Sequence, residues 1–138
     1  MKTLKCALIL LPLLLAAAGS TTVAQTQLEL NEKACESYKK ADAAMNKTYQ
    51  QILSRYRADT LFIQKLKAAQ RAWISYRDAH LEALYPAADK RAAYGTVNPM
   101  CQCAALEELT VERTRILKQW VDGREEGDVC GGSIKTKE

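Results

Sequence analysis

The sequence predicts an all-α protein, a small antiparallel three-helix bundle stapled by disulfides. Three long segments carry apolar residues at three- and four-residue steps, the spacing of a helix that buries one face. No segment shows the alternation of a β-strand, and the connections between the periodic segments are short. Four cysteines follow residue 24. In a small exported domain, an even number of cysteines indicates two disulfides.

The first 24 residues are typical of a secretory signal peptide. Two lysines fall within the first five residues, an apolar run covers residues 6–18, and Thr22-Val23-Ala24 is a small-residue cleavage site. The run is short for a membrane span, although a retained anchor is the alternative. We therefore expect cleavage after Ala24, no membrane span in the cleaved chain, and a location in the periplasm or outside the cell.

Cleavage would leave about 114 residues, enough for one small domain. Its 18 basic and 16 acidic residues give a formal charge of +2, and no basic block occurs. A nucleic-acid partner is therefore not indicated. We divide the chain into a signal peptide (1–24), a helical domain (25–121) and a glycine-rich polar tail (122–138) tethered by Cys130.

The first helix should run roughly from Asn31 to Arg57. Asn31 or a neighbour would cap its start, and residues 58–60 would form the turn that follows. Asp42 is the one carboxylate inside the apolar stripe. The stripe consists of Tyr38, Ala41, Met45, Tyr49, Ile52 and Tyr56.

The second helix should run from about Thr60 to Leu84, because Pro86 marks an end. Its stripe consists of Phe62, Leu66, Ala69, Trp73, Tyr76 and Leu84. A loop follows at residues 85–100, with one short helical turn in its middle.

The third helix should run from Pro99 or Met100 to Val121. Proline suits a first helical turn, and Asn98 would cap it. Its stripe consists of Leu106, Leu109, Ile116, Leu117 and Trp120. In the tail that follows, Cys130 is the only residue that predicts an ordered structure.

Polar residues also lie inside the apolar stripes: Asp42, Gln70, Arg77, His80 and Arg113. In the segment QRAWISYRDAH (70–80), Gln70, Arg77 and His80 share the face of Trp73, because each helical residue turns the chain by about 100°. Buried guanidinium groups need acceptors, and Asp42 is the expected counter-charge of both arginines. We interpret this set as a structural polar layer; an anion-binding pocket is the alternative.

Catalysis and cofactor binding are not indicated. The lone histidine has no serine or free cysteine on its face, and the acidic residues lie mostly on polar faces. We therefore expect no enzyme and no cofactor. Cys101 and Cys103 would be the start of a soft-metal site, but disulfides are the preferred interpretation. Among three possible connectivities we favour Cys35–Cys103 and Cys101–Cys130, because Cys103 projects towards the core edge and Cys101 towards the tail.

Several motifs follow one another in the order of a known family: Cys35, Met45-Asn46, Tyr49, QRAWISYRDAH, Gly95-Thr96, a cysteine, and LTVERTRIL at 109–117. Over residues 31–121 the chain resembles the LprI-like lysozyme inhibitor domain of exported bacterial proteins. The resemblance implies a disulfide-bonded helical domain in the cell envelope that binds lysozyme. Many members carry a cysteine just after the W..YRD stretch, where this chain has His80-Leu81.

Two functions are therefore considered. The first is an inhibitor that occludes the active site of a lysozyme or related muramidase. The second is a periplasmic structural, stress or adaptor protein that binds another protein. If the first holds, the expected contact is the loop 85–100. Tyr85 and Tyr94 are of a type enriched at binding hot spots, and Lys90 and Arg91 could meet the carboxylates of a lysozyme cleft. A plain connector with its tyrosines packed on the bundle is the alternative.

Overall fold

The structure, a computed structural model, describes residues 25–137. It contains four helices: α1 (Gln27–Arg55), α2 (Thr60–Leu84), α3 (Lys90–Tyr94) and α4 (Asn98–Asp122). Within the described residues there is no β-strand, only an isolated bridge between Arg124 and Thr136. The all-α prediction is thus confirmed for this part of the chain. The predicted signal peptide and its cleavage site at Ala24 lie outside the described residues.

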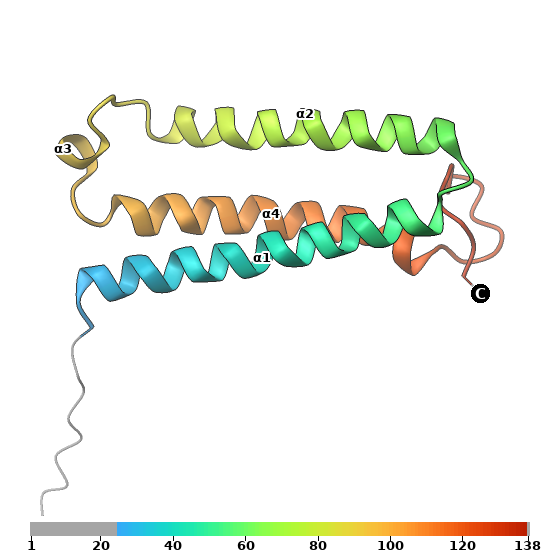
Figure 1. Ribbon diagram of the computed structural model, residues 1–138, viewed down its shortest axis with the longest axis horizontal. Coiled ribbons are helices and arrows are strands. Elements are labelled where there is room, and N and C mark those ends of the chain that lie inside the picture. The colour runs from blue at the N-terminus through green and yellow to red at the C-terminus, as the bar shows by residue number, and fades with distance from the viewer. Residues whose placement is uncertain (1–24, 138) are drawn as a thin grey trace, which may run out of the picture.

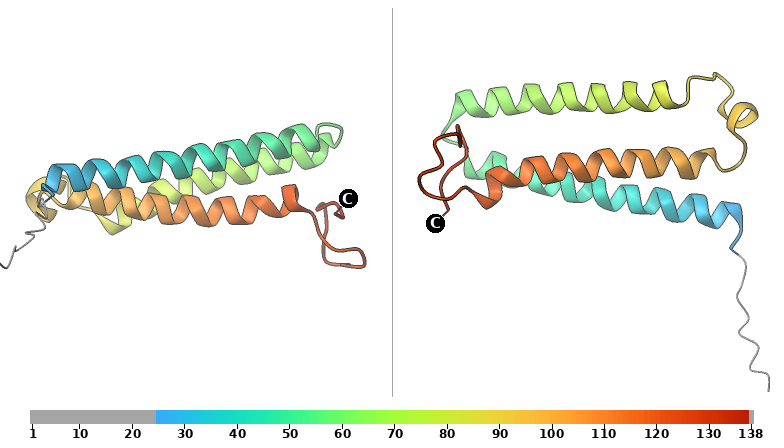
Figure 2. Two further views of the ribbon diagram at one scale, coloured as in Figure 1. Left: turned by 90° about the horizontal axis from the view of Figure 1, so that it is seen from below. Right: turned by 180° about the vertical axis from the view of Figure 1, so that it is seen from behind.

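The closest helix pair is α1 and α4, which lie side by side and run in the same direction (Figure 1). Helix α2 runs in the opposite direction, and its backbone stands further from both (Figures 1 and 2). The molecule therefore has two different ends. We call them the turn end, with residues 56–59 and the C-terminal half of α4, and the α3 end, with α3 and the first turns of α1 and α4.

Helix α1 begins four residues earlier than the sequence suggested, because Thr26 rather than Asn31 is its N-cap. The Thr26 hydroxyl accepts from the backbone N–H of Glu29 at 3.3 Å. The Glu29 carboxylate in turn accepts from the Thr26 N–H at 2.9 Å. This reciprocal capping box satisfies two backbone donors that the first helical turn leaves unpaired. The predicted bounds of α2 are confirmed, with Asp59 capping through the Phe62 N–H at 2.9 Å.

The buried apolar core gathers at the turn end. Its fully buried members are Ile52 and Leu117, both 0 % exposed. Met45, Tyr56 and Leu66 complete the buried cluster, and the rings of Phe62 and Trp120 pack against it. Tyr76 and Leu84, which the sequence placed in the stripe of α2, are exposed. Because α2 diverges from its neighbours, its C-terminal half has less of a core to face.

The tail is ordered by contacts other than Cys130, which corrects the prediction that this cysteine tethers it. Trp120 Nε1 donates to Ser133 Oγ at 3.0 Å, and the Lys135 N–H donates to Tyr56 Oη at 3.0 Å. Gly123 adopts φ +76°, and a Cβ there would lie 3.0 Å from the Lys135 carbonyl oxygen. The tail thus folds back onto the turn end through a close approach that only glycine permits.

Candidate functional site

The predicted polar residues meet around the indole of Trp73. The guanidinium carbon of Arg77 lies 5.4 Å from the ring centroid, and that of Arg113 lies 5.9 Å from it. Gln70 is buried one turn before Trp73 and connects α2 to α4 by accepting from Arg113 Nε at 3.0 Å. The structure therefore brings four of the five predicted residues together, Asp42 being the fourth.

Asp42 is not the shared counter-charge that the sequence suggested. Its Oδ1 lies 3.9 Å from Arg77 Nη1, whereas Arg77 Nη2 lies 2.7 Å from the carboxylate of Asp78, its own neighbour. Asp42 instead accepts from the amide of Asn46 at 2.9 Å. The Arg77 side chain is 15 % exposed and that of Asp42 36 %. The ion pair between α1 and α2 is thus loose and partly solvated, which makes it weak.

The partner of Arg113 is the neutral side chain of Gln70. Burial lowers the pKa of Arg113, because desolvation disfavours the charged guanidinium. Gln70 completes the arrangement by donating from Nε2 to Met45 Sδ at 3.6 Å. A chain of polar contacts therefore runs from α1 through α2 to α4, just beyond the apolar core.

His80 lies apart from this chain of contacts. Its ring stacks on that of Tyr76, with 5.7 Å between the centroids. His80 is half-buried and lies one turn beyond Arg77 on α2.

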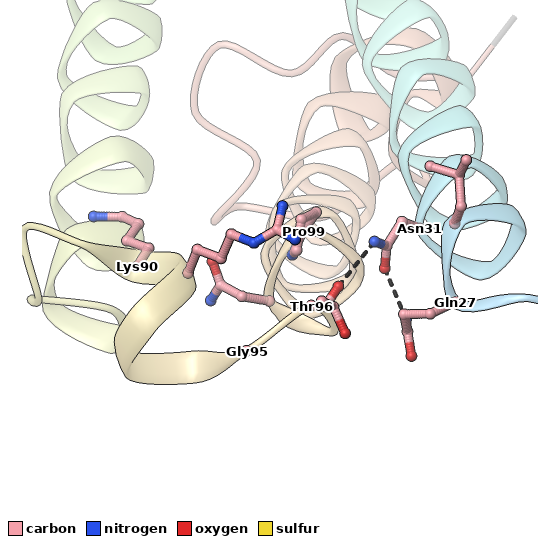
Figure 3. A pocket seen from close by; sticks show the side chains of 9 residues that line it. Gln27, Asn31, Lys90, Gly95, Thr96 and Pro99 are labelled. Atoms are coloured by element: carbon pink, nitrogen blue, oxygen red, sulfur yellow. Dashed lines mark hydrogen bonds between the residues drawn. The ribbon is translucent and has the colours of Figure 1, made fainter.

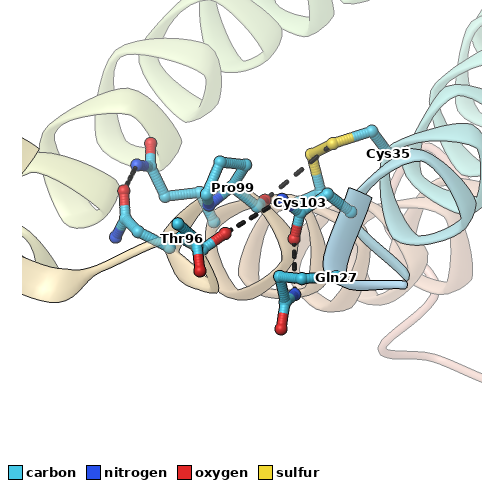
Figure 4. Close-up of a disulfide and its surroundings, with 8 residues drawn as sticks. Gln27, Cys35, Thr96, Pro99 and Cys103 are labelled. Carbon is cyan, nitrogen blue, oxygen red and sulfur yellow. Dashed lines mark hydrogen bonds between the residues drawn. A yellow bond between two sulfur atoms is a disulfide. The ribbon is translucent and has the colours of Figure 1, made fainter. Parts of the chain in front are cut away.

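One of the two favoured disulfides is present. Cys35 on α1 and Cys103 on α4 are bonded across 68 residues of sequence (Figure 4). The Cys35 sulfur also lies 3.9 Å from the Pro99 carbonyl oxygen, a contact and not a hydrogen bond, since a disulfide sulfur carries no proton. The bond therefore clamps the α3 end, where α1 and α4 begin.

The predicted disulfide Cys101–Cys130 is wrong, because both cysteines are free thiols. Cys101 sits in the first turn of α4, and Cys130 follows the other end of that helix. The intervening 21 helical residues span about 30 Å, far beyond disulfide reach. The metal alternative at Cys101 and Cys103 also fails, since the sulfur of Cys103 is already bonded.

The loop after α2 is a compact unit. The rings of Tyr85 and Tyr94 pack in a T-shaped arrangement with centroids 5.4 Å apart. Tyr94 Oη accepts a hydrogen bond from the Ala87 N–H at 3.3 Å. Burial raises the pKa of Tyr85, with Cys101 and Tyr94 adding to the effect. The two tyrosines are each half-buried and support the loop. Arg91 of α3 is exposed.

A cavity of about 610 Å³ lies between α1, α3 and the start of α4. Figure 3 shows Lys90 on one side of it, Gln27 and Asn31 of α1 on the other, and Thr96 and Pro99 between. Asn31 Nδ2 donates to the Thr96 carbonyl at 2.9 Å and so ties α1 to the loop. Arg91 also lines the cavity. Two of the four predicted binding residues, Lys90 and Arg91, thus share a concave surface.

Asn98 lines the same cavity, and its role was missed from the sequence. It is the first residue of α4 and not its cap: Val97 occupies that position, with no side-chain capping bond. The Asn98 side chain is buried, and its Oδ1 accepts from Gln102 Nε2. Its Nδ2 has no hydrogen-bond partner. A polar residue before Pro99 indicated a helix cap at Asn98. It did not indicate a buried side chain that pairs with Gln102.

Comparison with known proteins assigns the family. A family model described as "Lysozyme inhibitor LprI" matches residues 17–117. The uncharacterized protein R02472 of Rhizobium meliloti (strain 1021) is 36% identical over 113 residues, with 74% of this chain and 78% of that protein covered. No solved structure matches the chain significantly. The family match spans most of the chain and agrees with the motifs around Trp73, so the protein belongs to the LprI family of lysozyme inhibitors.

Proposed function

We propose that this protein, once exported, binds a lysozyme or related muramidase and inhibits it by occluding the active site with its α3 end. Family membership supports the activity. The observation that carries the choice of surface is the cavity that Lys90 and Arg91 line at one tip of the bundle. Occlusion requires a shaped, rigid surface and no chemistry by the inhibitor itself.

Local charge supports contact through this tip. A lysozyme cleft must present carboxylates for catalysis, and an exposed guanidinium is a suitable partner for them. The overall charge of the cleaved chain, +2, offers no long-range attraction to a basic enzyme. Recognition would then depend on the few cations at the α3 end, with Arg91 the more available because Lys90 already pairs with Glu82 at 2.8 Å.

Rigidity of the tip also supports the proposal. The disulfide Cys35–Cys103 and the bond from Asn31 to Thr96 fix α1 to the segment that carries the cations. A surface that is ordered before binding loses less conformational entropy in the complex.

No described helix is long and apolar enough to span a membrane.

A turbidity assay on purified peptidoglycan tests the activity. Lysozyme should clear the suspension more slowly as the protein is added, with saturation at a fixed molar ratio, and an equal amount of serum albumin should have no effect. Clearing at an unchanged rate with animal, plant and phage lysozymes would refute inhibition and leave the adaptor function.

A further inference from the structure

We propose that the cavity at the α3 end is a binding site for a carboxylate on a short aliphatic chain, held by Arg91 and by the side-chain amide of Asn98. The inference deepens the proposed function and rests on it only for the molecule that carries the carboxylate. Four features of the cavity argue for this ligand: its helix terminus, its unpaired donor, its net charge and its apolar wall.

The helix terminus is that of α4, whose first residues Asn98 and Pro99 line the cavity. This helix has 25 residues, and no side chain caps its N-terminus. A long helix carries a partial positive charge at its start, which favours an anion there. The other long helix at the cavity, α1, has its terminus satisfied by the Thr26 capping box and does not contribute such a site.

The unpaired donor is Asn98 Nδ2. Asn98 is 4 % exposed, and its Oδ1 is occupied by Gln102, so only the amide N–H groups remain free. A buried donor without a partner is costly, and an oxygen ligand would remove that cost. The other such atom among the described residues, Thr110 Oγ1, does not line this cavity. Nδ2 is closed to water in this structure, so binding through it requires the side chains around it to rotate and admit the ligand oxygen.

The net charge of the lining selects a monovalent anion. The ion pair between Lys90 and Glu82 leaves Arg91 as the uncompensated cation, and Arg91 makes no side-chain hydrogen bond or ion pair with any described residue. One positive charge balances one carboxylate, whereas a phosphate dianion would remain half-compensated. The planar guanidinium also matches the two oxygens of a carboxylate.

The apolar wall indicates what carries the carboxylate. Exposed Leu28 and the ring of Pro99 line the cavity beside the polar groups. The volume of about 610 Å³ falls within the range of small-molecule pockets. An acidic side chain or a small organic acid would place its methylene groups against this wall and its carboxylate on Arg91.

The test is a titration of the isotope-labelled exported protein with propionate, followed by NMR of the Asn98 side-chain amide. We expect a saturable shift with propionate and none with propionamide, its neutral isostere, at equal ionic strength. Arg91→Gln should weaken binding at least about tenfold, as expected for the loss of a charge-assisted guanidinium–carboxylate pair. Arg57→Gln, the same change at an exposed residue of the turn end, should leave propionate binding unchanged. Equal shifts with propionamide, or no effect of Arg91→Gln, would overturn the proposal.

A second arm separates this inference from the proposed function. Asn98→Asp keeps an acceptor for Gln102 but replaces the donor with a like charge, so propionate binding should be lost while the dispersed amide spectrum of the folded protein is kept. Propionate should also relieve inhibition in the turbidity assay if the carboxylate belongs to lysozyme. Propionate binding without relief assigns the cavity to a small organic acid and supports the carboxylate site. Inhibition without propionate binding refutes the site and spares the proposed function.

Discussion

The two ends of the helical domain are held together by different means. At the turn end, Ile52 and Leu117 are completely buried, and aromatic rings pack around them. At the α3 end, the connection is a disulfide and a few polar bonds, such as that from Asn31 to Thr96. A cross-link holds helices together without requiring their side chains to pack. The α3 end can therefore keep a cavity and the exposed Arg91, because its stability does not depend on a core.

The disulfide should show the largest effect on stability. Replacing Cys35 and Cys103 by serine frees a loop closed over 68 residues, which should lower the free energy of unfolding by about 4 kcal/mol in the chain-entropy model. Urea denaturation measures the change.

The matched control replaces the two free cysteines, Cys101 and Cys130, and should cost less than about 0.5 kcal/mol. Thiol titration of the denatured, unreduced, cleaved protein should find these two thiols. No free thiol, or an equal loss of stability in the control, would contradict the single cross-link.

Core truncation at the turn end should come next. Leu117→Ala removes a side chain that is 0 % exposed and should cost about 3 kcal/mol. Val111→Ala, on the same helix but exposed, should cost less than about 0.5 kcal/mol. If the two variants unfold at the same urea concentration, the core is not where the structure places it.

The polar layer between the ends should contribute less. Arg113→Met leaves the buried oxygen of Gln70 without its donor and should cost about 1–2 kcal/mol. Arg77→Met removes only the loose pair with Asp42 and the exposed pair with Asp78, so it should cost less than about 1 kcal/mol. Chemical denaturation of both variants decides, and a reversed order would restore Asp42 as the main counter-charge.

Alkaline pH should produce the smallest loss of stability, with one contributing tyrosine at the α3 end and one beside the core. Burial raises the pKa of Tyr85 at the α3 end and of Tyr49 beside the core above the ordinary 10.0. The unfolded chain therefore ionises first. The stabilisation is complete below pH 10 and is lost as the pH rises through the folded-state pKa values. Tyr85→Phe and Tyr49→Phe should each flatten this fall in urea melts at stepped pH; an unchanged slope in both would exclude the tyrosines as its source.

Much of the fold could be predicted because it depends on local patterns. The stripes and Pro86 defined α2, and the projection of Cys103 towards the core edge suggested its bond to Cys35. The earlier start of α1 also has a local signal, since Thr26 is followed three residues later by Glu29, the spacing of a capping box.

The rest depends on distances between helices, which spacing along the chain does not define. The number of cysteines predicted two disulfides, and the projection of Cys101 towards the tail favoured its bond to Cys130. Both cysteines are free, because the tail stays near the C-terminal end of α4. The pairing of Arg113 with Gln70 depends on how α2 and α4 are rotated about their axes. The free donor of Asn98 depends on which neighbour its oxygen meets.

In the proposed function, the α3 end and not the turn end contacts the target. The most direct measurement compares lysozyme inhibition by two folded variants with equal loss of charge. One is Lys90→Gln with Arg91→Gln at the α3 end, and the other is Arg57→Gln with Lys65→Gln, both exposed near the turn end. Both must first melt like the unmodified protein. We predict that inhibition is lost in the first variant and retained in the second; undiminished inhibition by the first would contradict contact through the α3 end.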